Sequence, residues 1–211
     1  LVNQSLVSLK SGRKSQYCMV SSRRIEKLED AGDIIKRFIL PFEGYLHLSS
    51  RRQMKLKQGL QGGMKTLRDH LNHPIHLRKF IRKIMFSNAD GTLVDFIALR
   101  ERDTLCYHLF LRQDVEDIIC RNTEVVNSKA RAEGQMDAQK TLIRGMINNS
   151  MVSIIDNEVR TKTPTSTNFL AHGQTERLLK LLTENTNKES IERESKYGQI
   201  TSHGKAIGMT Y

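Results

Sequence analysis

The segment IHLRKFIRKIMF, residues 75–86, combines helical periodicity with a strict division between apolar and basic side chains. At 100° per residue the apolar side chains share one arc of a helix: Leu77, Phe80, Ile81, Ile84 and Met85. The bases share the opposite arc: Arg78, Lys79, Arg82 and Lys83. The apolar arc requires a core to pack against. Because the helix contains no acid, its bases cannot form i, i+4 pairs, and we expect an outside partner to compensate them.

The same bias extends over a longer segment. The chain of 211 residues has a formal net charge of +11, and residues 51–86 contain ten bases against one acid, Asp69. These ten are the candidate nucleic-acid-binding residues: Arg51, Arg52, Lys55, Lys57, Lys65, Arg68, Arg78, Lys79, Arg82 and Lys83. Such a concentration of bases is typical of a surface that contacts backbone phosphates. The segment has few aromatic residues for base stacking, which favours a duplex or a structured RNA over a single strand.

The order of secondary-structure signals in residues 22–112 resembles a winged helix-turn-helix. The expected elements are a helix at 22–40, a strand at 45–48, helices at 51–60, 64–73 and 75–86, and a hairpin of strands at 92–99 and 105–112. The glycines of QGG, residues 61–63, are expected to separate the second helix from the third. In a winged helix the hairpin would be the wing, and one helix would enter the major groove.

The rest of the chain is expected to be mainly helical. Helical patterns cover residues 114–133 and 135–149, a strand pattern follows at 151–159, and residues 174–185 form an amphipathic helix. The sequence therefore predicts an α+β, predominantly helical protein in three parts. These are a basic winged-helix-like region at 22–112, a helical region for self-association or partner contact at 113–185, and a loosely ordered polar tail at 186–211.

The segment FSNADGTLVDF, residues 86–96, is the place where a catalytic or metal-binding loop could be sought. Phe86 and Ile97 occupy positions where a calcium-binding EF-hand loop has oxygen ligands. The stretch ADGTLVD resembles the first motif of haloacid-dehalogenase-like phosphatases, but Asn88 stands where that family has its nucleophilic Asp. Ser, Asn, Asp and Gly in succession predict a turn.

Other candidate sites carry less weight. Asp156, Glu158 and Lys162 are the residue types of metal-dependent nucleases, but their spacing differs from that of such a site. A hydrolase built around Asp90 or Asp156 is therefore the third class of function, after the two given below. His70, His73 and His76 are interrupted by Pro74, which favours surface histidines over metal ligands. The cysteines are Cys18, Cys106 and Cys120, a sparse and odd count that favours a reducing compartment. We expect no cofactor and no metal.

The preferred function is nucleic-acid binding through backbone phosphates, without catalysis, by a regulatory, replication or packaging factor. The alternative is an assembly protein, such as a viral or phage nucleocapsid or scaffold subunit. A basic helix could also lie on an anionic membrane, but the chain has no Trp anchor. We expect a homo-oligomer that does not bind membranes. With no signal-peptide or membrane-spanning pattern, we expect it in the cytoplasm or nucleus.

Overall fold

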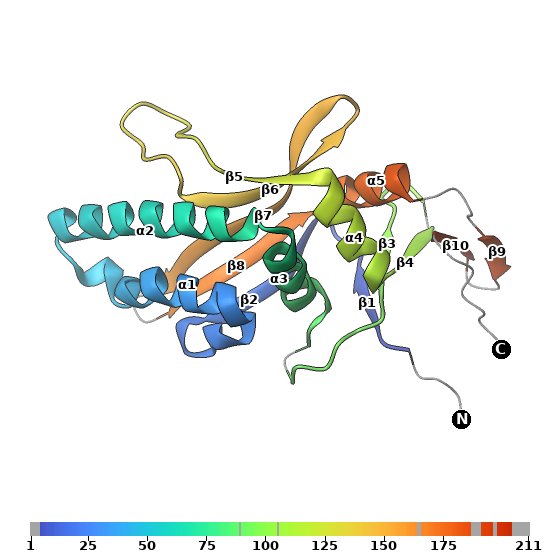
Figure 1. The fold of residues 1–211 in the computed structure, drawn as a ribbon, viewed down its shortest axis with the longest axis horizontal. Coiled ribbons are helices and arrows are strands. Elements are labelled where there is room, and N and C mark those ends of the chain that lie inside the picture. Colours follow the sequence, from blue (N-terminus) through green and yellow to red (C-terminus); the bar gives the residue numbers. More distant parts are fainter. Residues whose placement is uncertain are drawn as a thin grey trace.

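A five-stranded antiparallel sheet organises the computed structural model, which describes residues 5–88, 90–104, 106–163, 166–186, 191–195 and 198–203. The strand order is β2-β8-β7-β6-β5, and every neighbouring pair is antiparallel. Its strands are β2 (Lys14–Ser21), β5 (Thr123–Asn127), β6 (Lys140–Ile147), β7 (Ser150–Thr163) and β8 (Ser166–Gln174). β5, β6, β7 and β8 pair in chain order, so most of the sheet is one meander (Figure 1).

A second, smaller sheet lies beside the first. Its order is β1-β3-β4, continued by β10 and β9. The strands are β1 (Val7–Lys10), β3 (Phe96–Arg100), β4 (Tyr107–Leu111), β9 (Ile191–Ser195) and β10 (Gly198–His203). β3 and β4 form an antiparallel hairpin, whereas β1 runs parallel to β3 and β10 runs parallel to β4.

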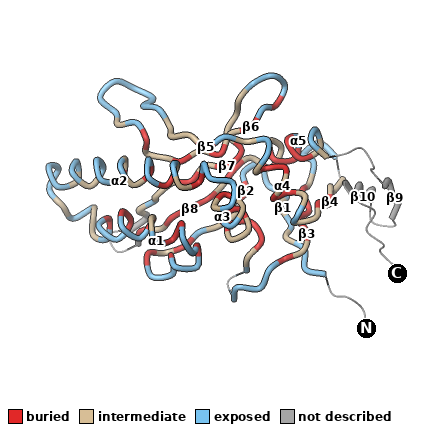
Figure 2. The backbone as a smooth tube through the Cα atoms, in the orientation of Figure 1, coloured by how far each residue is buried: buried red, intermediate tan, exposed pale blue. Residues whose placement is uncertain are grey.

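Helices cover one face of the larger sheet. They are α1 (Glu29–Ile39), α2 (Ser50–Leu71), α3 (Pro74–Phe86), α4 (Arg112–Asn122) and α5 (Thr175–Asn185), with short 3-10 turns at Ser22–Leu28, Leu40–Phe42 and Tyr45–His47. The ring of Phe80 on α3 meets that of Phe169 on β8 edge to face, and the hydroxyl of Thr141 on β6 donates to the Met64 carbonyl of α2. Figure 2 shows the buried residues concentrated between helices and sheet. Among the described residues, no helix combines the length and the apolar character needed to cross a bilayer.

Alternation along the strands puts polar side chains on the opposite face of this sheet. On β6, Ile143 and Ile147 point into the helix-covered core, so Lys140, Leu142 and Arg144 point the other way. On this second face Gln16 and Met19 of β2 and Met146 of β6 are exposed. We call it the open face.

The prediction of a predominantly helical protein with a winged helix is wrong. Two five-stranded sheets and five helices make up the described residues, so the protein is not predominantly helical, and no winged helix is formed in the described part of the chain. The stretch 45–48, expected as a strand, is a 3-10 turn, and QGG does not interrupt α2, which is continuous across residues 61–63. The expected hairpin is confirmed as β3 and β4. It lies in a five-stranded sheet rather than forming a wing.

The expected helices of the second half are only partly present. Residues 114–133 are helical only as far as Asn122, and residues 135–149 contain β6 instead of a helix. The strand within 151–159 and the helix at 174–185 are confirmed by β7 and α5. Of the expected tail at 186–211, the backbone of β9 and β10 is described, and most of the other positions lie outside the described residues.

The predicted turn is present, with a hydrogen bond from the Gly91 N–H to the Asn88 carbonyl. The Asp90 carboxylate accepts hydrogen bonds from the backbone N–H and the hydroxyl of Thr92, and Gly91 has a φ of 90°. These bonds favour the charged carboxylate and lower the pKa of Asp90. The side chain of Asp90 therefore has a complete local role in shaping a turn.

Gly63 allows α2 to continue where its sequence suggests a break. A Cβ atom at this position would lie 2.1 Å from Cδ1 of the buried Phe38 ring on α1. Substitution of Gly63 by Ala should therefore force the ring to move and lower the free energy of unfolding by about 1–3 kcal/mol in urea titrations. Gly59→Ala is the control, since nothing lies within 4 Å of its added Cβ and helix propensity alone should stabilise the protein by up to ~1 kcal/mol. Equal effects from both substitutions would contradict this account of the helix crossing.

Candidate functional site

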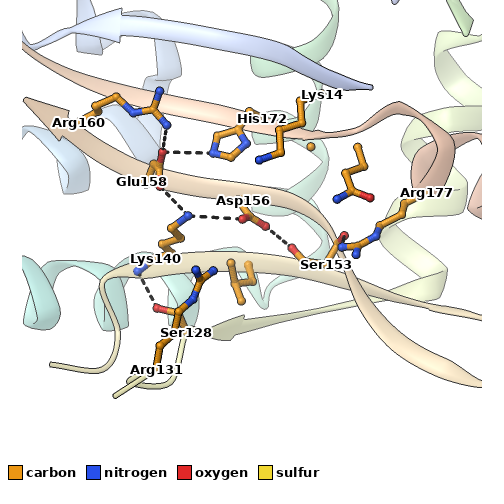
Figure 3. Close-up of a pocket in the computed structure, with 13 residues that line it drawn as sticks. Lys14, Ser128, Arg131, Lys140, Ser153, Asp156, Glu158, Arg160, His172 and Arg177 are labelled. Atoms are coloured by element: carbon orange, nitrogen blue, oxygen red, sulfur yellow. Dashed lines mark hydrogen bonds and ion pairs between the residues drawn. The ribbon is translucent and has the colours of Figure 1, made fainter. Parts of the chain in front are cut away.

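The open face holds a polar hollow of about 460 Å³ (Figure 3). Residues from β2, β6, β7, β8, the start of α5 and the loop between β5 and β6 line it: Lys14, Ser128, Arg131, Lys140, Leu142, Ser153, Asp156, Glu158, Arg160, His172, Gly173, Gln174 and Arg177. This set contains five Lys or Arg side chains and two carboxylates. We call it the open-face pocket.

Glu158 is the centre of the ionic contacts in the pocket. Its carboxylate lies 2.7 Å from Nζ of Lys140 and 3.3 Å from Nε2 of His172, and it also pairs with Arg160. Strand register produces this arrangement, because Lys140 stands directly opposite Glu158. The bond from His172, together with those from Lys140 and Arg160, holds the pKa of Glu158 well below its usual range. Glu158 is therefore ionised and its oxygens are fully engaged.

Asp156 forms a second ion pair with Lys140. Nζ of Lys140 lies 3.6 Å from the carboxylate of Asp156, which also accepts a hydrogen bond from the Ser153 hydroxyl. In Figure 3 the Lys140 ammonium lies between Asp156 and Glu158. An ammonium in this place acts as the counterion of both carboxylates. The two acids therefore orient pocket bases and are not arranged as a pair of free metal ligands.

Three cationic groups of the pocket remain without a carboxylate. Within the described part of the chain, neither Lys14 nor Arg131 has an acidic partner, and Arg177 donates only to the Ser153 carbonyl, at 3.0 Å. With Lys140 and Arg160 balanced by Asp156 and Glu158, these three groups leave the pocket with a net positive charge. A concave site with uncompensated, convergent cations can bind anions such as phosphate groups.

The predicted bases of α2 lie on its exposed side. Arg51, Arg52, Lys55, Lys57 and Lys65 are exposed and form no ion pair with the acids that the structure describes. Figure 2 shows that the first turns of α2 are mainly exposed. Arg68 differs, since its guanidinium pairs with the neighbouring Asp69 at 2.6 Å.

The predicted bases of α3 are instead held by acids from other helices. Arg82 forms two hydrogen bonds to Glu116 of α4, of 2.8 and 2.7 Å, and Arg78 pairs with Asp117 of the same helix. Two further pairs run to α1: Lys79 to Asp30 at 3.3 Å and Lys83 to Glu29 at 2.8 Å. The hydrogen bond to Glu116 raises the pKa of Arg82, and that to Asp117 raises the pKa of Arg78. The compensating partner expected for this basic arc is thus supplied within the chain.

The bases of the pocket were not predicted because they come from β2, β6, β7, α5 and a loop, and because residues 135–149, which contain Lys140, were expected to be a helix. One signal was available in DNEVR, residues 156–160, where charged side chains recur at every second position, as on one face of a strand. Asp156 and Glu158 do share a face of β7, but the lysine between them is Lys140 from β6. The side chain of Lys162 lies outside the described residues.

Comparisons of this chain with models of protein families, with curated protein sequences and with solved structures found no match.

Proposed function

We propose that this protein binds nucleic acid through backbone phosphates, and that the open-face pocket is the main contact. The observation that supports this most is the convergence of Lys14, Arg131 and Arg177 in one hollow without carboxylate partners. When Lys or Arg side chains contact phosphates, the counterions condensed on the nucleic acid are released, which gives affinity that does not depend on sequence.

The exposed bases of α2, on the helix-covered side of the sheet, are a second group of phosphate contacts and favour a polymer over a single small anion. The loop at residues 128–139 connects the two places, since Asp137 accepts a hydrogen bond from Gln61 of α2 while Arg131 lines the pocket. Arg51, Arg52 and Lys55 then lie further along α2, on its exposed first turns. A chain of regularly spaced phosphates can contact both the pocket bases and the α2 bases, whereas a single phosphate can contact only one of these two groups.

Phosphate contacts of this kind position a protein without reading bases. The proposed protein is therefore a sequence-tolerant binder with a regulatory, replication or packaging role, and the pocket acts by charge and shape and not by catalysis. The bases of α3 are assigned to the ion pairs with α1 and α4 described above.

Titration of the purified chain with duplex DNA, single strands and structured RNA at several salt concentrations tests this proposal. We expect binding to each duplex sequence with similar affinity. The slope of log affinity against log salt should be about −2.7 or steeper, because three uncompensated cations each contribute about 0.9 with a duplex. Absence of binding at low salt, or a slope near zero, would contradict the proposal.

A further inference from the structure

A cluster of one carboxylate and two imidazoles lies where α1, α2 and α3 meet. Asp30 comes from the first turn of α1, His70 from the last turn of α2 and His76 from the first turn of α3. One ligand atom from each of the three lies within 4.8 Å of the other two. The cluster is on the helix side of the molecule and is separate from the open-face pocket.

The imidazole of His76 supplies a second, independent observation. Its Nδ1 atom is inaccessible to solvent and has no hydrogen-bond partner, although Oδ2 of Asp30 lies only 3.4 Å away. A buried ring nitrogen without a partner requires an explanation, because buried polar atoms are nearly always bonded. A bound cation beside the Asp30 carboxylate would give Nδ1 the partner that it lacks.

The spacing fits a transition-metal ion. Zinc binds imidazole nitrogen and carboxylate oxygen at about 2.0–2.2 Å in tetrahedral geometry, which places neighbouring ligand atoms about 3.3–3.5 Å apart. The 3.4 Å between Asp30 and His76 already has this length. The rings of His70 and His76 are stacked with centroids 4.0 Å apart, so rotation of His70 about its side-chain bonds can bring it to the third position.

We propose that Asp30, His70 and His76 form a binding site for a divalent transition-metal ion of the zinc type, which links α1, α2 and α3. Two imidazoles and one carboxylate are a ligand set that zinc uses, and a fourth position is left for water. The bound ion would stabilise the junction between the end of α2 and the start of α3 at Pro74.

Lys79 competes with a metal ion for the Asp30 carboxylate. Its ammonium lies 3.3 Å from the same Asp30 oxygen that faces His76, and half of its side chain is exposed. When a metal ion binds, Lys79 moves toward solvent and the ion replaces it beside Asp30. Removal of Lys79 should therefore tighten metal binding, an effect that a purely structural ion pair does not produce.

The test uses the full chain with Zn²⁺ and with Co²⁺ as a spectroscopic substitute. At free zinc near a hundred times its Kd, the Tm should rise by roughly 5–10 °C, because the ion binds only the folded state. Co²⁺ should produce visible bands of a tetrahedral site with nitrogen and oxygen ligands. His70→Gln and His76→Gln should each weaken binding by at least about 100-fold, since loss of groups that merely orient ligands costs about 10–100-fold.

His73→Gln is the matched control, because His73 neighbours His76 with ring centroids 5.1 Å apart but is outside the ligand set. It should leave the metal-dependent rise in Tm unchanged, and Lys79→Gln should increase affinity. A metal effect that survives His70→Gln and His76→Gln would overturn the proposal. So would cobalt bands of a thiolate complex, which would place the ion on a cysteine, or the absence of any change on adding either metal.

Discussion

Replacement of Arg82 by Gln should lower the free energy of unfolding by about 2–3 kcal/mol. The guanidinium forms two hydrogen bonds to Glu116, whose side chain is only 1% exposed, and loss of the arginine leaves that carboxylate buried without its main partner. Loss of one member of a buried pair costs about 3–5 kcal/mol. The expected cost is smaller here because Arg82 is 40% exposed and Arg78 remains 3.7 Å from Glu116. Urea unfolding of both proteins measures the difference.

Lys83→Gln is the control for this experiment. Lys83 is a neighbouring base of the same helix, but its partner Glu29 is exposed, so the substitution should cost no more than about 1 kcal/mol. The double substitution Arg82→Gln with Glu116→Gln should cost less than the sum of the two single substitutions, because it removes both charges. Additive losses, or equal losses for Arg82→Gln and Lys83→Gln, would show that Arg82 has no special role in the fold.

These pairs explain why the partners of the basic arc of α3 could not be predicted from the sequence. The arc itself was predicted correctly, and its apolar side is buried as expected. Its partners come from residues 29–30 and 116–117, which are distant in sequence and join α3 only in the folded chain. A charge pattern within one helix therefore gave the position of the bases but not their partners.

Tertiary contacts also explain the elements that the sequence predicted wrongly. Glycine disfavours a helix by about 1 kcal/mol per residue, yet α2 continues through residues 61–63 because Gly63 lets it pack closely on Phe38. Residues 140–147 have no strong strand periodicity, but hydrogen bonds to β5 and β7 on either side make them a central strand. The pocket could not be predicted from local patterns, since its bases come from β2, β6, β7, α5 and a loop.

A variant without the three unpaired cations of the pocket should lose most of its affinity for nucleic acid. Substitution of Lys14, Arg131 and Arg177 by Gln should raise the Kd for a duplex by about 100-fold or more near 0.1 M salt, because three phosphate contacts are lost. The fold should survive, since none of the three has a carboxylate partner among the described residues and only one hydrogen bond, from Arg177 to Ser153, is removed. Tm and binding are measured on the same preparations.

A matched control removes the same charge from the other side of the sheet. Arg23, Lys36 and Arg37 are exposed bases of the first 3-10 turn and α1, and none has an acidic partner within the described residues. Their replacement by Gln lowers the net charge equally, so a loss of affinity through overall charge alone would appear in both variants. We expect the control to change the Kd by only a few fold.

The salt dependence of duplex binding is the measurement that tests the central claim most directly. For the pocket variant the slope of log affinity against log salt should become shallower by about 2.7 relative to the unmodified protein, at about 0.9 per lost phosphate contact. For the control variant the slope should stay almost unchanged. Equal changes in both variants, or an unchanged slope in the pocket variant, would contradict the assignment of the open-face pocket as the phosphate-binding surface.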